Sequence, residues 1–149
     1  MTSQEILSEE MQILKSDIII RHEQSGQVAT GKTKASFEVN SNSSTGQLLG
    51  AGYVGVLQQG RKPGGVPKEF IDILQKWANS KGISFSSEKQ FNLWANSVKW
   101  KIIREGTKLY RSGQRYDIFD TPIENFNTRI SLRLANYYEA ELINEIFKF

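Results

Sequence analysis

The first apolar pattern of the chain has helical spacing. Apolar side chains recur every three or four positions at Leu7, Met11, Leu14 and Ile18. Ser3 precedes this stripe and is a residue type that caps helices, so the pattern predicts a helix from about residue 3 to residue 20. Residues 18–20 are three consecutive β-branched isoleucines, and a strand there is the alternative.

The period changes after Gly31. Apolar or small residues alternate with polar ones at Thr33, Ala35, Phe37 and Val39. Alternation of this kind predicts a half-buried strand. Residues 40–46 consist of Ser, Asn, Thr and Gly, which favour a turn, and a second extended run is expected over residues 47–57. Together these segments predict a hairpin or small antiparallel sheet.

Residues 60–67 hold two prolines and three glycines, so they predict a loop. Pro67 is expected at the first position of the next helix, where a missing N–H has no cost. One apolar face marks this helix at Phe70, Ile73, Leu74, Trp77 and Ala78. Gly82 is expected to end it. We interpret four aromatic or aliphatic side chains of this region as structural core: Phe70, Ile73, Trp77 and Trp94.

Two more helices are predicted after residue 86. Ser87 and Gln90 form a capping-box pattern, and Gly106 ends that helix. Its buried stripe is expected at Phe91, Trp94, Ala95, Val98 and Ile102. Residues 107–120 are expected to form a strand or an irregular loop.

Thr121 as N-cap, Pro122 and Glu124 predict the start of a last helix that runs to Phe147. At about 1.5 Å per residue it would be about 40 Å long. Since this exceeds what a small domain needs to cover its core, part of the helix is expected to contact another subunit. We therefore predict an α+β fold in a single domain over residues 1–149. Its order is an N-terminal helix, a small antiparallel sheet, two packed helices and a long C-terminal helix over residues 121–149.

Composition narrows the function classes. A chain of 149 residues with 38% hydrophobic residues can bury one core. It has no cysteine, which excludes thiolate chemistry. Its one histidine, His22, is expected at the surface, so a His-based triad is improbable. No catalytic cluster, metal site or cofactor site is evident, and we expect no enzyme. No apolar run is long enough for a membrane span, and the acidic N-terminus is unlike a signal peptide, which predicts that the chain is cytoplasmic where it is made.

Charge is segregated along the chain. Residues 54–115 carry twelve Lys or Arg against four acids, a net of +8, whereas residues 1–20 and 116–149 each carry −3. A basic middle between acidic ends can face nucleic acid or the acidic ends of a neighbouring copy. A solvated surface of mixed sign is the third interpretation. Trp100 lies between Lys99 and Lys101, off the apolar stripe of its helix, and is expected to be exposed.

The segment from Gly26 to Thr33 formally matches the phosphate-binding pattern G-x-x-x-x-G-K-[ST]. That chemistry needs a buried strand before the loop and a helix after it. Polar residues precede Gly26, and an alternating strand-like run follows Thr33. A nucleotide hydrolase using this segment is therefore a minor alternative.

A longer stretch of sequence resembles a known family. It consists of Tyr53-Val-Gly-Val-Leu-Gln-Gln-Gly-Arg-Lys-Pro-Gly-Gly-Val-Pro67, then Ile71, Trp77 and Lys81-Gly-Ile83, and later Lys101-Ile-Ile-Arg-Glu-Gly-Thr107. In order and spacing these pieces resemble the minor tail, neck or tail-completion proteins of tailed double-stranded DNA bacteriophages. The small residues of 28–32 are similar to that family's step into its first strand. The resemblance covers about residues 26–120. One departure is Gln58-Gln59, where family members often have an acidic residue.

The resemblance implies a structural virion protein that forms a ring at the head–tail connector, the neck or the tail end, with DNA passing through its centre. The implied partners are copies of itself, neighbouring connector, adaptor or tail proteins, and double-stranded DNA bound without sequence specificity. No membrane is implied. The expected interface residues are those of the loop: Gly60, Arg61, Lys62, Pro63, Gly64, Gly65 and Pro67. A second expected surface, facing DNA or another subunit, is basic: Lys99, Lys101, Arg104, Lys108 and Arg111.

The alternative from another class is a small basic DNA-binding regulator or packaging accessory protein. The basic middle of the chain fits both interpretations, because phosphate attraction alone carries no sequence information. We expect the purified chain to be largely monomeric and to form rings only on its partner.

Overall fold

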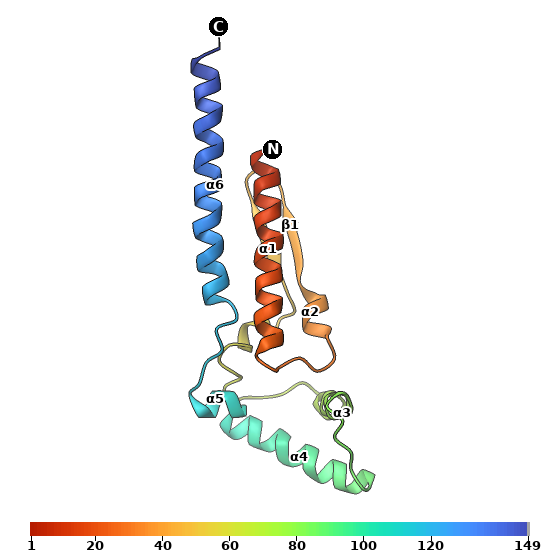
Figure 1. Cartoon of the computed structure of the whole chain (residues 1–149). Helices are drawn as coiled ribbons and strands as arrows, with labels where there is room; N and C mark the ends of the chain where they lie inside the picture. The colour runs from red at the N-terminus through yellow and green to blue at the C-terminus, as the bar shows by residue number, and fades with distance from the viewer. Residues whose placement is uncertain (149) are drawn as a thin grey trace.

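The computed structural model describes residues 1–148 and shows an α+β chain in two tiers (Figure 1). The upright tier contains helix α1 (Ser3–Gln24), the short helix α2 (Lys32–Ser36), strands β1 (Glu38–Ser41) and β2 (Gly46–Leu49), and the long helix α6 (Asp120–Ile146). The second tier contains α3 (Phe70–Ser80), α4 (Glu88–Glu105) and α5 (Lys108–Ser112). The predicted order of N-terminal helix, antiparallel sheet, packed helix pair and long C-terminal helix is confirmed.

Helix α1 begins at Ser3, as the pattern predicted, and ends at Gln24, four residues later than predicted. The Thr2 hydroxyl accepts from the Glu5 N–H at 3.2 Å, and the Glu5 carboxylate accepts from the Thr2 N–H at 2.6 Å. This reciprocal capping box makes Thr2, not Ser3, the N-cap. The isoleucines at 18–20 are helical, so the strand alternative is wrong.

The predicted strand over residues 33–39 is wrong in its first half. Residues 32–36 form α2 instead, after Gly31 at φ +75°. This segment has no large apolar residue, so nothing requires it to be extended. β1 then pairs antiparallel with β2, with Glu38 opposite Leu49 and Ser41 opposite Gly46. The second extended run also ends early, because residues 54–56 form a 3-10 turn, η1 (Val54–Val56).

The core of the upright tier lies under α1. Met11, Leu14 and Ile18 pack with Phe37 from the hairpin and with Ile118. Ile118 comes from the segment before α6 and is fully buried. Residues 107–120, predicted as a strand or loop, therefore supply α5, an irregular segment and one core side chain.

The second tier has its own cluster of Leu74, Phe91 and Ala95. Phe70 and Trp94 are only partly buried against it, and the side chains of Ile73 and Trp77 are 45% and 39% exposed. The assignment of Ile73 and Trp77 to the core is wrong, because one helix packing on one other helix covers a narrow strip of each. Trp77 instead lies parallel to Trp94, with ring centroids 6.5 Å apart.

The ends of the second-tier helices agree only in part with the pattern. Helix α4 has Ser87 as N-cap and ends at Gly106, as predicted. Helix α3 ends near Gly82 as predicted, but it begins at Phe70, three residues after Pro67. Pro67 lies in a turn, where its carbonyl accepts from the Phe70 N–H at 3.1 Å.

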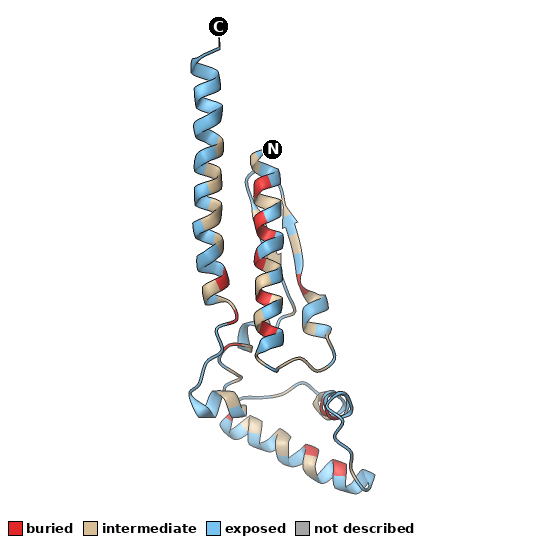
Figure 2. Cartoon of the chain, in the orientation of Figure 1, coloured by how far each residue is buried: buried red, intermediate tan, exposed pale blue. Residues whose placement is uncertain are grey.

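Only the first half of α6 is covered by other elements. A seam of Phe126, Ile130, Leu134 and Tyr137 is partly buried against the upright tier, whereas every residue from 138 to 148 is exposed (Figure 2). The helix extends past the N-terminus of α1 into open space. Within residues 1–148, no helix is both long and apolar enough to cross a membrane. Phe149, the last residue of the predicted C-terminal segment, lies outside the described residues.

Candidate assembly surfaces

The loop of residues 60–67 is held against its own chain. The Arg61 N–H donates to the Thr107 hydroxyl and the Thr107 N–H donates to the Arg61 carbonyl, both at 2.9 Å. The Gly64 N–H donates to the Ile103 carbonyl at 3.0 Å. These bonds fix the first half of the loop to the junction between α4 and α5.

Two glycines make this close approach possible. A Cβ on Gly60 would lie 2.6 Å from the Thr107 hydroxyl, and a Cβ on Gly106 would lie 2.5 Å from the Arg61 carbonyl oxygen. Both glycines also have φ near +80°, which side chains disfavour. The expectation that Gly60 brings the backbone close to a partner is wrong, since it faces the chain's own α4–α5 junction.

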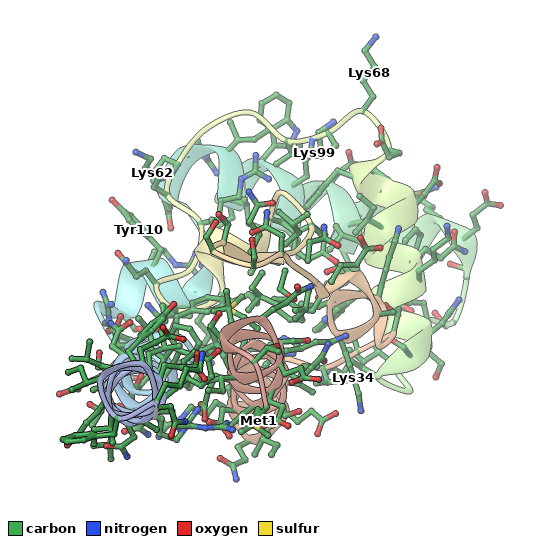
Figure 3. The ribbon with its side chains drawn as sticks, turned by 90° about the horizontal axis from the view of Figure 1, so that it is seen from above. Met1, Lys34, Lys62, Lys68, Lys99 and Tyr110 are labelled. Carbon is green, nitrogen blue, oxygen red and sulfur yellow. The ribbon has the colours of Figure 1, made fainter. Side chains whose placement is uncertain are left out.

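The second half of the loop faces outward. The Arg61 guanidinium donates to the Gly65 carbonyl across the loop, so it already has a partner. Lys62, Pro63, Gly64, Gly65 and Pro67 are all exposed. Seen from above, Lys62, Lys68 and Lys99 lie on the side of the molecule away from α1 and α6 (Figure 3). Among the residues that the structure describes, the Lys62 ammonium has no hydrogen-bond or ion-pair partner, so Lys62, rather than Arg61, is the free cation of this loop.

The predicted basic residues lie on α4 and α5, but not on one face, because Lys99 and Lys101 point to nearly opposite sides of α4 at 100° per residue. Lys101, Arg104, Lys108 and Arg111 are exposed, and Lys99 is half-buried. Arg111 is paired with Glu105 at 3.4 Å, whereas within residues 1–148 the other four make no ion pair. Trp100, beside them on α4, is 56% exposed, as predicted.

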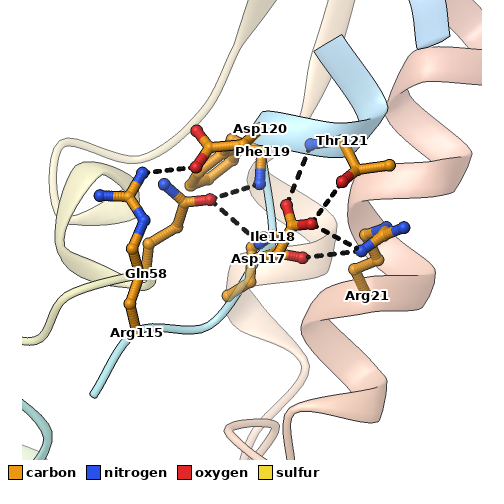
Figure 4. A network of polar contacts seen from close by, with 8 residues as sticks. All are labelled: Arg21, Gln58, Arg115, Asp117, Ile118, Phe119, Asp120 and Thr121. Atoms are coloured by element: carbon orange, nitrogen blue, oxygen red, sulfur yellow. Dashed lines mark hydrogen bonds and ion pairs between the residues drawn. The ribbon is translucent and has the colours of Figure 1, made fainter. Parts of the chain in front are cut away.

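A buried amide joins the two tiers (Figure 4). The side-chain oxygen of Gln58 accepts from the N–H groups of Ile118 and Phe119 at 3.0 and 2.7 Å. The backbone carbonyl of Gln58 accepts from the Tyr116 N–H at 2.8 Å. The structure explains why glutamine serves here, because the position needs an acceptor for two N–H groups and not a charge.

Asp117 lies in the same joint, three residues before the start of α6. Its carboxylate accepts from the Thr121 N–H at 3.0 Å and from the Thr121 hydroxyl, and Arg21 lies 3.2 Å from the other side. The hydrogen bonds from Thr121, with Arg21 and Arg115 nearby, lower the pKa of Asp117. The predicted cap, Thr121, is thus inside the first turn. The N-cap residue is Phe119, whose side chain makes no cap bond, and the Asp117 carboxylate accepts from the first-turn N–H of Thr121 instead.

A buried carboxylate ties α6 to α1. Glu10 is 2% exposed and bonds Arg129 at 2.7 Å and Arg133 at 2.9 Å. Burial by itself would raise the pKa of Glu10, but the hydrogen bonds and charges of the two arginines lower it overall. No local sequence pattern indicates this cluster, because Glu10 lies 119 residues from Arg129 and 123 residues from Arg133.

His22 and the phosphate-loop pattern both depart from expectation. His22 is buried, not at the surface, and burial lowers its pKa. The segment 26–33 follows helix α1 and leads into helix α2. A phosphate-binding loop requires a strand before it, and here a helix precedes the segment. The strand that the sequence predicted after the segment is also replaced by a helix. Lys81 donates to the Gly26 and Val28 carbonyls at 3.3 and 2.9 Å. Carbonyls, rather than a ring of N–H groups, therefore line this part of the loop.

Comparison of the chain with protein-family models, with curated proteins and with solved structures finds no match. The proposals below therefore depend on the sequence pattern and the geometry.

Proposed function

We propose that this chain is a structural virion protein that forms a ring at the head–tail connector, the neck or the tail end of a tailed bacteriophage, with DNA passing through it. The observation that carries the proposal is the free half of α6. Residues 138–148 contact no other element, and Leu142, Ile146 and Phe147 are each more than 60% exposed. A helix that leaves such side chains in water is stabilised when a neighbouring subunit covers them.

The loop of residues 60–67 supports the same assignment. Its backbone is fixed to Thr107 and Ile103 at Arg61 and Gly64, and the residues between these two anchors, Lys62 and Pro63, are exposed. A surface that is ordered before docking loses less entropy on association. The basic group on α4 and α5 offers diffuse attraction, which suits DNA that must slide.

Electron microscopy of purified particles tests the proposal directly. The expected result is a ring at the neck or tail end whose density fits this chain, with α6 between subunits. Particles that contain the chain nowhere in the neck or tail would refute the assignment.

A pair of variants adds a functional readout. Arg61→Glu and Lys62→Glu are each expected to leave the chain folded and to yield heads and tails that do not join, with Lys62→Glu the cleaner test because that side chain has no intramolecular bond. Glu38→Lys, an exposed charge change on β1 and away from both the loop and α4, is the control. Normal infectious particles from Lys62→Glu would remove the loop from the mechanism.

The DNA-binding regulator or packaging accessory is the second candidate. It is favoured by Lys101 and Arg104, which lie beside the exposed Trp100 and make no ion pair within residues 1–148. A regulator should bind free duplex DNA at submicromolar concentration with a steep salt dependence, whereas a ring protein should bind it weakly as a monomer. A gel-shift titration at two salt concentrations separates the two.

A further inference from the structure

Helix α6 carries a second apolar stripe that no other element covers. At 100° per residue this α6 outer stripe lies opposite the seam that faces α1. Its members are Leu132, Ala135, Glu139, Leu142, Ile143 and Ile146, all of them exposed. One carboxylate, Glu139, therefore lies within an otherwise apolar surface.

Helix α4 carries a matching stripe on its solvent face. Leu93 and Trp100 are 64% and 56% exposed there. The α4 outer stripe comprises Lys89, Leu93, Asn96, Ser97, Trp100 and Arg104, which also line one shallow groove of about 1040 Å³. Arg104 lies one turn beyond Trp100, so this stripe combines an apolar centre with a cation at each end.

The two stripes cannot meet within one chain. The free end of α6 and helix α4 lie at opposite ends of the molecule (Figure 1). Any contact between them must join two copies.

We propose that the α6 outer stripe of one copy docks antiparallel on the α4 outer stripe of the next, with Glu139 against Arg104. This inference rests on the proposed ring and names the contact between its subunits. Seven residues separate Glu139 from Ile146 and seven separate Arg104 from Ser97, about 10 Å in each helix. The register thus places Leu142 and Ile143 over Trp100 and Ile146 near Ser97.

Charge selects this pairing over its main competitor. Residues 116–149 carry −3 and residues 54–115 carry +8, and within the described residues neither Glu139 nor Arg104 has an ion pair. Pairing two α6 stripes would bring like carboxylates together among apolar side chains, whereas α6 on α4 gives a carboxylate–guanidinium pair. A contact between different surfaces also repeats head to tail and closes into a ring when the rotation permits.

The contact is small. A stable interface buries about 800 Å² per partner, more than two or three turns of one helix pair supply. Free copies should therefore associate weakly and hold together when a partner ring aligns them. This agrees with the expectation that the purified chain is largely monomeric.

Cysteine cross-linking tests the geometry cleanly, because the natural chain has no cysteine. One preparation carries Ser97→Cys, the other Ile146→Cys, and the two are mixed at high concentration with a short bis-maleimide. The expected product is the mixed dimer. Ala140→Cys, exposed on another side of α6, is the matched control and should react at least about fivefold less. Dimers of Ile146→Cys with itself, or equal yields from Ala140→Cys, would overturn the proposal.

A charge exchange tests the pair itself. Arg104→Glu and Glu139→Arg should each lower the cross-link yield about fivefold, and the two variants mixed should restore it; an unchanged yield or no rescue refutes the pair. The outcomes separate this inference from the proposed function. If particles contain the ring but the cross-link does not form, the proposed function stands and the α6–α4 contact is refuted. If the cross-link forms but the chain is absent from the neck and tail of particles, the contact stands and the proposed function is refuted.

Discussion

Replacing Gln58 by methionine should destabilise the upright tier. The change keeps the length of the side chain and removes the oxygen that accepts from Ile118 and Phe119. The Ile118 N–H is buried, so leaving it unpaired costs about 1–3 kcal/mol; the Phe119 N–H is partly exposed and loses about 0.5–1.5 kcal/mol. The expected total is about 1.5–4.5 kcal/mol.

Urea unfolding followed by far-ultraviolet circular dichroism measures this loss. Tryptophan fluorescence alone does not, because Trp77, Trp94 and Trp100 all lie in the second tier. Gln59→Met, at the adjacent exposed position, should change stability by less than about 0.5 kcal/mol. Gln58→Glu keeps an acceptor and should lose less than Gln58→Met. A loss below about 1 kcal/mol for Gln58→Met would refute the role assigned to this amide.

Three further changes test other parts of the structure. The free energy of unfolding should fall as the pH drops below about 4.5, because the folded-state pKa values of Glu10 and Asp117 are lowered and the unfolded chain therefore binds protons first. In urea unfolding, Glu10→Gln should show a smaller change in this free energy between pH 7 and pH 3 than the natural chain. Gly106→Ala should cost roughly 2–4 kcal/mol in the same assay, since its Cβ meets the Arg61 carbonyl, whereas Gly113→Ala, at a similar φ but in open space, should cost only about 1 kcal/mol. Removing residues 140–149 should leave the unfolding free energy within about 1 kcal/mol of the full chain, because residues 140–148 are all exposed, and a larger loss would contradict the free position of this segment.

Local sequence patterns predicted the helices α1 and α4 well, but they predicted residues 32–36 and the burial of Trp77 poorly. Stripes at Leu7–Ile18 and Phe91–Ile102, with caps at Ser87 and Gly106, predicted α1 and α4 because capping and amphipathicity depend on nearby residues. Residues 32–36 were mistaken for strand because short polar residues satisfy either period. Burial of Trp77 was overestimated because an apolar face does not reveal how much of it a partner covers.

The contacts between distant segments were beyond such patterns. Gln58 meets Ile118 and Glu10 meets Arg129 across 60 and 119 residues. Neither pair has a local signal, since a glutamine or a glutamate in a polar stretch resembles any surface residue. Of the candidate surfaces, the basic group on α4 and α5 was predicted, whereas the inward anchoring of Gly60 and the α6 outer stripe required the fold.

The chain path sets the order in which the protein is completed during synthesis. Residues 60–115 are inserted between the two halves of the upright tier, and Gln58 and Tyr116 meet at the base of the insertion. The pair α3 and α4 can pack as soon as it leaves the ribosome, whereas α1 waits for Ile118 and α6. Until α6 has been synthesised, α1 keeps an uncovered apolar side, so chains that stop before α6 should be recognised by chaperones and proteases.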